Sequence, residues 1–360
     1  MPASRDQIID RLRTVNDPEL HRDIVTLGMV KDVAIDGGKV TVHVELTTPA
    51  CPLKETIEND VRNAVLPVDG VDEVGVEFTA QVQQSPQAKA KQDNPLPGVQ
   101  HIIAVGAGKG GVGKSTVAVN LAVGLAREGA KVGLLDGDIY GPSLPTMLDM
   151  GSDPPRTANN MIVPFQKAGI KAMTIGKLVE PDKPLIWRGP MAHGAFNQLA
   201  KQTDWGELDY LVIDLPPGTG DVPLTMSQIL PLTGAVVVCT PQKVAQDDAR
   251  RAVGMFRQLQ IDVLGIVENM SYFIGDDGKE YDIFGKGGAE RMAGDMDVPF
   301  LGHIPINMAL RENCDSGDPL ANFKDEKLGE ELQTVVRNLA GQISIKAMSG
   351  VPDQPTLSVS

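Results

Sequence analysis

Short apolar runs alternate with helix-like stretches over most of the chain after residue 100. Each run is rich in Val, Ile and Leu, as is typical of parallel strands whose two faces are both buried. The seven runs are HIIAVGAG, KVGLLDGD, IKAMTIG, YLVIDLPP, GAVVVCTP, VLGIVENM and PFLGHIP. This alternation predicts an α/β fold with a doubly wound, mostly parallel sheet, in which ligands bind at the carboxyl ends of the strands.

The first 80 residues show a different pattern and predict a small α+β domain. Helices are expected over 5–15 and 53–66, and strands over 30–35, 39–47 and 71–79, with a tight turn at Asp36-Gly37-Gly38. Residues 81–98 are polar and contain prolines, which predicts a flexible linker. The larger domain is then expected over 99–345, followed by a disordered tail over 346–360.

Composition and charge restrict the partners. The 33 basic and 47 acidic residues give a net charge of −14, which disfavours binding to nucleic acid or to an anionic membrane. No apolar run is long enough to span a bilayer, and the N-terminus lacks the apolar core of a signal peptide, so we expect a cytoplasmic protein. The three widely spaced cysteines argue against a disulfide framework and suit a reducing compartment.

The segment from Gly108 to Thr116, GKGGVGKST, matches the phosphate-binding loop (P-loop) pattern. Its glycines allow backbone N–H groups to surround an anion, and the helix that follows directs its positive end to the same point. Lys114 is therefore predicted to contact the β and γ phosphates, and the Ser115 hydroxyl to bind magnesium. The additional lysine, Lys109, is predicted to reach a nucleotide in a facing subunit, which implies a homodimer.

Aspartates stand at the ends of two predicted strands. Asp214 is expected to hold magnesium through water, and Gly218 after it to offer a backbone N–H to the γ-phosphate. Asp138 is predicted to position water or act as a general base in γ-phosphate hydrolysis. For Asp136 two interpretations stand open, a catalytic carboxylate or a residue that caps the strand end.

Five segments together resemble the Mrp/ApbC branch of the deviant P-loop ATPases, relatives of MinD and of the nitrogenase iron protein. These segments are GKGGVGKST, LLDGDIYGPSLP, IWRGPM, VIDLPPGTGD and VENMSYF. The N-terminal segments NDPEL and TTPACPLK are similar to the small domain of iron–sulfur assembly factors. This resemblance implies an ATP-binding and ATP-hydrolysing carrier that binds iron–sulfur clusters and transfers them to apoproteins. Its cofactors would be ATP and magnesium, and its partners cluster donors and apo iron–sulfur proteins.

The resemblance also implies roles for individual residues. Lys109 would cross the homodimer interface, Thr116 would touch the α-phosphate, and Asn269 would hydrogen-bond adenine, with the segment around Pro305 beside the base. The nucleotide loop would comprise Gly108, Lys109, Gly110, Gly111, Val112, Gly113, Lys114, Ser115 and Thr116.

The chain departs from that family where many members carry a Cys-x-x-Cys pair. After VENMSYF it reads IGDDGKEYDIFGKGG, and 275–282 within this segment predicts a solvated hairpin. A stable cluster bridged by four such thiolates is therefore not expected. Cys51 is the best remaining ligand candidate, because a helix start and nearby Lys54 would both lower the pKa of its thiol. The alternative for Cys51 is a half-buried cap residue, whereas Cys239 and Cys314 are expected to be bystanders.

Two other functions are alternatives to the carrier. A metal-free switch of the MinD/ParA type would call for a C-terminal basic amphipathic helix or a basic DNA-binding face, and the chain has neither. A nucleotide-dependent reductase would require two cluster cysteines per subunit near the nucleotide loops. No pair of histidines has metal-ligand spacing, so each of the five is interpreted as a structural or strand-end residue: His21, His43, His101, His193 and His303.

Overall fold

The computed structural model describes residues 3–18, 20–82, 94–138, 141–178, 189–218, 226, 229–275 and 277–348. Contacts divide the chain into two compact units, residues 1–83 with 343–360, and residues 84–342. Most of the expected linker and tail lies outside the described residues. Leu96, at the end of the expected linker, is buried in the core of the larger unit, and the last helix continues to Met348.

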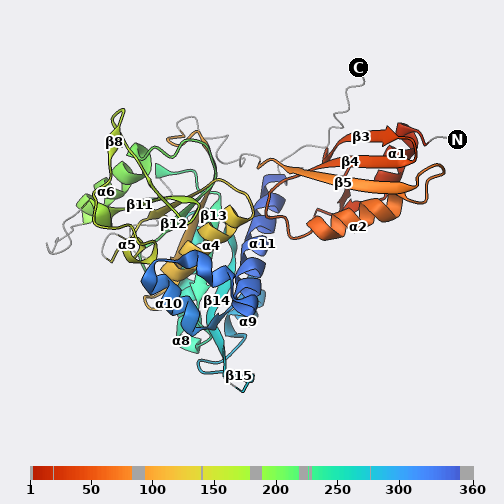
Figure 1. The fold of residues 1–360 in the computed structure, drawn as a ribbon. Helices are drawn as coiled ribbons and strands as arrows, with labels where there is room; N and C mark the ends of the chain where they lie inside the picture. Colours follow the sequence, from red (N-terminus) through yellow and green to blue (C-terminus); the bar gives the residue numbers. More distant parts are fainter. Residues whose placement is uncertain are drawn as a thin grey trace. The chain divides into compact units, whose positions relative to one another are not determined.

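The N-terminal unit is a small sheet covered by two helices (Figure 1). Strands β3 (Val30–Asp36) and β4 (Lys39–Leu46) are antiparallel, and β5 (Glu73–Ala80) runs parallel to β4. Helices α1 (Arg5–Leu12) and α2 (Lys54–Val65) bury apolar residues in the same core as these strands. The turn at Gly37 has φ of 59°, as a tight hairpin requires. The short pair β1 (Asn16–Asp17) and β2 (Arg22–Asp23) was not predicted.

All seven predicted runs of the larger unit form strands of one sheet. They are β6 (Val99–Ala107), β7 (Val132–Asp136), β11 (Ile170–Thr174), β12 (Leu208–Asp214), β13 (Gly234–Cys239), β14 (Val263–Ile274) and β16 (Phe300–Ile306). The order is β10-β11-β7-β12-β6-β13-β14-β15, with β16 also beside β14. These seven strands are parallel, and β10 (Phe165–Lys167) and β15 (Glu280–Tyr281) add antiparallel pairs.

Helices pack on this sheet and on one another, and they complete the expected α/β architecture. The main ones are α4 (Lys114–Arg127), α6 (Gly189–Gln202), α8 (Lys243–Gln258), α9 (Gly288–Asp295), α10 (Met308–Ser316) and α11 (Glu326–Met348), with short α5 (Leu144–Met147). Helix α4 contacts β6, β7 and β12, and residues 117–125 of it are buried, which fixes its first turn beside the ends of these strands. Among the described helices, none is both long and apolar enough to cross a membrane. The predicted fold class is confirmed.

Candidate functional site

The loop between β6 and α4 has the backbone that a phosphate cradle needs. Gly113 is the N-cap of α4 and has φ of 80°, a conformation that glycine adopts without strain. At Gly108 a Cβ atom would lie 2.2 Å from the backbone of Asp248 on α8, so that only glycine fits there. Glycine is therefore required at the first and the last glycine position of the motif for two different steric reasons.

Lys114 lies where two strand ends meet this loop. Its Nζ is 2.5 Å from Asp214 Oδ1, 3.9 Å from Asp138 Oδ2 and 3.3 Å from Ser115 Oγ. Parallel pairing of β7 with β12 brings the two strand-end aspartates together, since Asp136 and Asp214 are register partners. The structure thus assembles at one point the predicted lysine, hydroxyl and carboxylates.

Asp214 has an unused acceptor in this cluster. The residue is fully buried, and its Oδ2 has no hydrogen-bond partner within the described part of the chain. Burial raises the pKa of Asp214, and the Lys114 ammonium opposes that rise. A buried orphaned carboxylate oxygen beside the Ser115 hydroxyl fits magnesium or its bound water, because oxygen ligands suit this ion.

Asp136 holds the loop that follows β7. Its carboxylate accepts hydrogen bonds at 3.1–3.3 Å from the backbone N–H groups of Asp138, Ser143 and Leu144 and from the Thr174 hydroxyl. Burial, together with the charge of Asp214, raises the pKa of Asp136 to about 7. Of the two interpretations of Asp136, these contacts favour a residue that caps the strand end. Asp136 thereby positions the backbone of Asp138.

Asn269, within β14 just before its pairing with β16 becomes irregular, contacts the P-loop itself. The side chain is only 3% exposed, and its Nδ2 donates to the Val112 carbonyl at 2.8 Å. A Cβ atom at Gly113 would lie 2.1 Å from the same Nδ2, so the asparagine also excludes larger residues there. The adenine contact expected of Asn269 stays a prediction.

The remaining predicted nucleotide contacts have the following places. The Gly218 N–H donates to the Ala107 carbonyl at 3.0 Å, so a contact from this amide to a γ-phosphate requires that bond to open. Pro305 is buried in β16, and Lys109 and Thr116 are half-buried. The trans role of Lys109 and the phosphate and base contacts stay predictions.

Comparison with known proteins places this site in a family. The family model of the NUBPL iron-transfer P-loop NTPases matches residues 98–341, and a model named iron–sulfur cluster assembly protein matches residues 5–78. The chain belongs to the NUBPL iron-transfer P-loop NTPase family. The resemblance inferred from the motifs is therefore confirmed, as is the nature of the large domain as a P-loop NTPase.

Similar proteins cover nearly the whole chain. An iron–sulfur cluster carrier protein of Deinococcus radiodurans is 50% identical over 97% of this chain and 98% of its own length. A protein of the same name from Escherichia coli strain K12 is 40% identical over 95% of this chain and 92% of its own. A nucleotide-binding protein of Archaeoglobus fulgidus in complex with ADP has a TM-score of 0.56 and 40% identity, over 62% of this chain and 89% of its own.

The cysteines of this family member differ in their surroundings. Cys239 is buried in β13, and burial raises the pKa of its thiol to about 12, with Lys109 opposing the rise. Burial also raises the pKa of Cys314. Cys51 is half-buried against the N-terminal core just before α2, and the Lys54 ammonium lies 5.5 Å from the centre of the Phe78 ring. The role of Cys51 as a cluster ligand stays a prediction.

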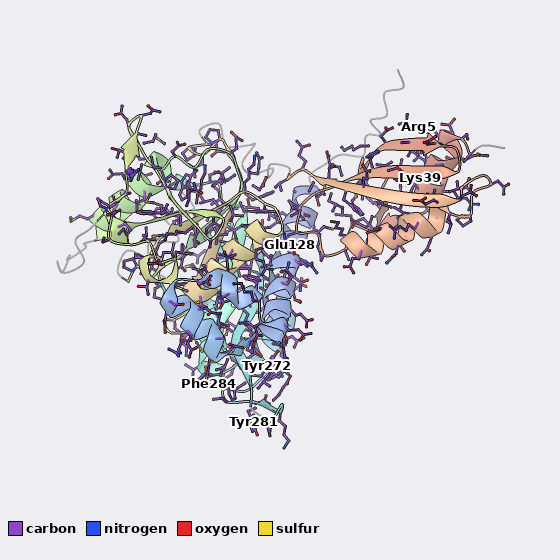
Figure 2. The ribbon with its side chains drawn as sticks, in the orientation of Figure 1. Arg5, Lys39, Glu128, Tyr272, Tyr281 and Phe284 are labelled. Atoms are coloured by element: carbon purple, nitrogen blue, oxygen red, sulfur yellow. The ribbon has the colours of Figure 1, made fainter. Side chains whose placement is uncertain are left out.

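The segment without the Cys pair forms a hairpin, as expected. Strand β15 pairs with the end of β14, and Tyr281, Ile283 and Phe284 are exposed on this segment, two of them labelled in Figure 2. The hairpin is fastened to α11, since the Tyr272 hydroxyl donates to Glu331 at 2.5 Å and Lys327 pairs with Glu280 at 3.6 Å.

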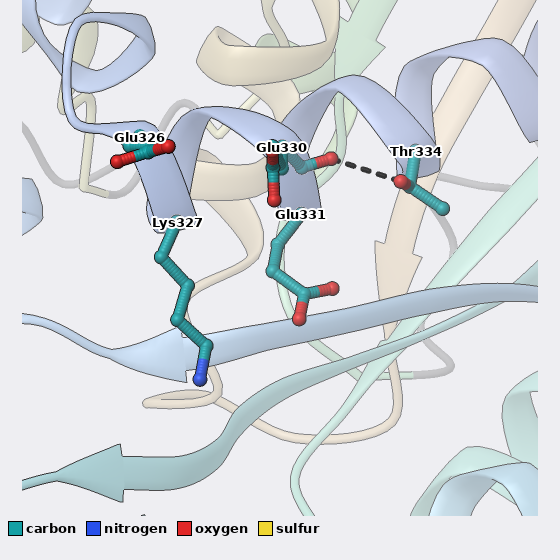
Figure 3. A pocket seen from close by; sticks show the side chains of 5 residues that line it. All are labelled: Glu326, Lys327, Glu330, Glu331 and Thr334. Atoms are coloured by element: carbon teal, nitrogen blue, oxygen red, sulfur yellow. Dashed lines mark hydrogen bonds between the residues drawn. The ribbon is translucent and has the colours of Figure 1, made fainter. Parts of the chain in front are cut away.

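A pocket of about 490 Å³ adjoins this attachment. Lys327 and Glu331 extend from the same side of α11 in Figure 3. The pocket is lined by Glu326, Lys327, Glu330, Glu331 and Thr334. None of these residues belongs to the nucleotide loop, so the pocket is separate from the predicted site.

Histidines form no metal centre in the ranges that the structure describes, where no group of three or more metal-ligating side chains was found. His101 Nδ1 lies 3.3 Å from the Thr233 hydroxyl, and His43 pairs with Glu77. The side chain of His193 lies outside the described residues. His303 contacts Glu268, a buried carboxylate beside Asn269 to which the sequence interpretation gave no role. Only the VENM motif itself could have drawn attention to it.

Proposed function

We propose that this chain is an ATP-dependent iron–sulfur cluster carrier, which binds a cluster as cargo and passes it to apoproteins. The observation that carries the proposal is the convergence of Lys114, Ser115, Asp138 and Asp214 at the P-loop. The iron–sulfur cargo is supported by the names of relatives that match nearly the whole chain and by the assembly-domain match at its N-terminus. The cytoplasm and a homodimeric state belong to the same proposal.

Nucleotide binding would redistribute the charges around Lys114. The phosphates would draw its ammonium away from Asp214, since the triphosphate carries more negative charge than one carboxylate. Asp214 would then be free, with its unpartnered oxygen, to hold magnesium through water beside Ser115. Magnesium bound there would offset the charge on the phosphate oxygens.

The contacts of Asp138 support a role for it in the proposed hydrolytic step. Its N–H is fixed by Asp136, its Oδ1 accepts from the Gly141 N–H at 3.3 Å, and its Oδ2 faces Lys114. We propose that this carboxylate orients a water molecule toward the γ-phosphate and accepts its proton as the new P–O bond forms. The bond between the β–γ bridging oxygen and the γ-phosphorus breaks, and ADP leaves with that oxygen.

A second candidate function follows from the buried thiols. Because Cys239 and Cys314 are buried with raised pKa values, few thiolates are available to hold a cluster. The chain would then act as a metal-free, ATP-dependent switch of the MinD/ParA type, or as an adapter for clusters held by other proteins. The two candidates differ in whether the purified chain itself carries iron.

Cluster delivery to an apo-ferredoxin tests the first candidate. We expect anaerobically reconstituted full-length protein to convert apo-ferredoxin to its holo form with magnesium and ATP, as followed by visible absorption. Lys114→Ala should lower ATP affinity about 10- to 100-fold, because a charge-assisted contact to phosphate is lost. At ATP concentrations that saturate only the wild type, cluster delivery by the Lys114→Ala variant should fall together with its ATP affinity. Delivery at the same rate without nucleotide would contradict ATP dependence, and no delivery at all would contradict the carrier.

A further inference from the structure

A buried carboxylate anchors the turn that carries Asn269. Glu268 on β14 is fully buried and accepts hydrogen bonds from four donors. These are Ser271 Oγ at 2.5 Å, His303 Nδ1 at 3.2 Å, and the N–H groups of Gly287 and Ala289 at 2.8 and 2.7 Å. The two backbone donors lie at the N-terminus of α9, where the helix dipole favours a negative charge.

The strand between Glu268 and Ser271 is irregular. Met270 has φ of 55°, and the register between β14 and β16 shifts between Asn269 and Phe273. A non-glycine residue in this left-handed region is strained and persists only where its surroundings hold it. The hydrogen bond from Ser271 back to Glu268 spans this turn and supplies such a constraint.

The turn directs Asn269 at the P-loop. The Asn269 amide fixes the Val112 carbonyl, and in a planar trans peptide the following N–H, that of Gly113, points the opposite way. A phosphate cradle needs this arrangement, with carbonyls directed outward and N–H groups directed inward. The orientation of the last loop peptide therefore depends on where Asn269 is held.

We propose that Glu268 is a positioning residue for nucleotide binding, acting through the Ser271 bond and the Asn269 amide on the peptide between Val112 and Gly113. His303 and the start of α9 hold the carboxylate from the other side. The inference rests on the proposed binding of nucleotide at this loop. It adds a group from β14 that does not touch the nucleotide but determines the shape of its site.

A double-mutant cycle tests this coupling in the full-length protein. We expect Asn269→Ala and Ser271→Ala each to weaken the binding of a fluorescent ADP about five- to tenfold, equivalent to about 1 kcal/mol. The double variant should bind no more weakly than Asn269→Ala alone, because both changes remove the same constraint on the loop. Effects that multiply in the double variant would overturn the proposal, since a general loss of stability would weaken binding in either background.

Two further variants separate this proposal from neighbouring explanations. Glu290→Gln is the matched control, because its carboxylate faces the outer nitrogen of His303, at 3.5 Å, on the side away from Ser271, and its side chain is 57% exposed. Its ADP affinity should equal that of the wild type, and a loss as large as that of Ser271→Ala would overturn the proposal. Lys114→Ala tests the proposed function itself. If neither wild type nor Lys114→Ala binds ADP, the proposed function fails, whereas a multiplicative cycle with normal wild-type binding removes only the role of Glu268.

Discussion

At the residue scale, Lys114 is shared between groups that the proposed reaction uses separately. Asp214 pairs with it closely and Asp138 more distantly, although the two carboxylates are assigned different roles. Because Asp214 is fully buried, removing its charge also removes the main partner of a buried ammonium. The two aspartates should therefore respond differently to the same substitution.

Asp138→Asn should bind ATP and stall, whereas Asp214→Asn should bind it poorly. The amide at position 138 keeps the shape but cannot accept a proton, so turnover should fall by about 10²- to 10⁴-fold. At position 214 the loss of charge should lower both nucleotide affinity and its magnesium dependence. Isothermal titration with and without magnesium, together with phosphate release, measures both effects. Identical profiles for the two variants would refute this division of roles.

The two lysines of the loop should also separate binding from assembly. Lys114→Ala should lower nucleotide affinity, because its ammonium lies at the predicted phosphate site. Lys109→Ala should leave monomer binding intact but weaken ATP-dependent dimerisation and turnover, if it acts on the facing subunit. Sedimentation with and without ATP, and steady-state hydrolysis, provide the readouts. Hydrolysis at the wild-type rate in Lys109→Ala would show that the trans role is wrong.

Whether a site residue could be predicted from the sequence depends on how far along the chain its contacts lie. Lys114 and Ser115 belong to a local motif, and Asp138 and Asp214 follow strands whose carboxyl ends must meet at one edge of a parallel sheet. Glu268 could not be assigned, because its donors lie in α9 and β16 and meet it only through strand pairing and helix packing. Asp136 stayed ambiguous for the same reason, since its partners include a residue of β11.

At the element scale, long periodic segments were predictable and short ones were not. All seven apolar runs became strands because burial on both faces leaves an unmistakable composition. Elements of two or three residues, such as β1, β10 and β15, carry too few positions for any period to show. Helix α1 ends at Leu12 rather than at residue 15, and the chain then turns back so that Asn16 pairs with Asp23.

The contacts between β14, β16 and α9 should stabilise the fold to an extent that depends on pH through His303. The side chain faces Glu268 on β14 and Glu290 on α9, with Glu331 on α11 also contributing, and the hydrogen bond to Glu268 raises the pKa of His303 above its ordinary 6.5. A raised folded-state pKa means that the charged form stabilises the fold. This contribution is complete below about pH 6.5 and is lost as pH rises through the folded-state pKa.

His303→Gln should therefore cost more stability at pH 6 than at pH 9. We expect a difference in unfolding free energy of about 1.5–3 kcal/mol at the lower pH, the range for a hydrogen bond to a charged group. Glu268 remains ionised throughout this interval, because its hydrogen bonds outweigh burial and lower its pKa to about 2. Urea denaturation of wild type and variant at both pH values measures the effect. An equal loss at pH 6 and pH 9 would contradict the charged interaction.

At the scale of the whole molecule, nucleotide chemistry and the one accessible thiol belong to different units. The larger unit carries the P-loop, and its Cys239 and Cys314 are buried. The segment that lacks the Cys-x-x-Cys pair is a hairpin, and its Glu280 pairs with both Lys286 and Lys327. Cys51, half-buried just before α2 in the N-terminal unit, is the remaining thiol. We therefore predict that cluster binding depends on the N-terminal unit more than on the hairpin.

The cysteine variants of the full-length protein decide this last point. We expect any reconstituted cluster to be labile, oxygen-sensitive and bridged between subunits, because one thiolate from each leaves iron coordination to be completed by oxygen ligands or an external thiol. Cys51→Ser should abolish it, whereas Cys239→Ser and Cys314→Ser should retain it, since a buried thiol with a raised pKa is a poor ligand. Iron and sulfide content and visible absorption after anaerobic reconstitution measure the outcome. Iron retained in Cys51→Ser would exclude this ligand, and a wild type that hydrolyses ATP but holds no iron would favour the adapter.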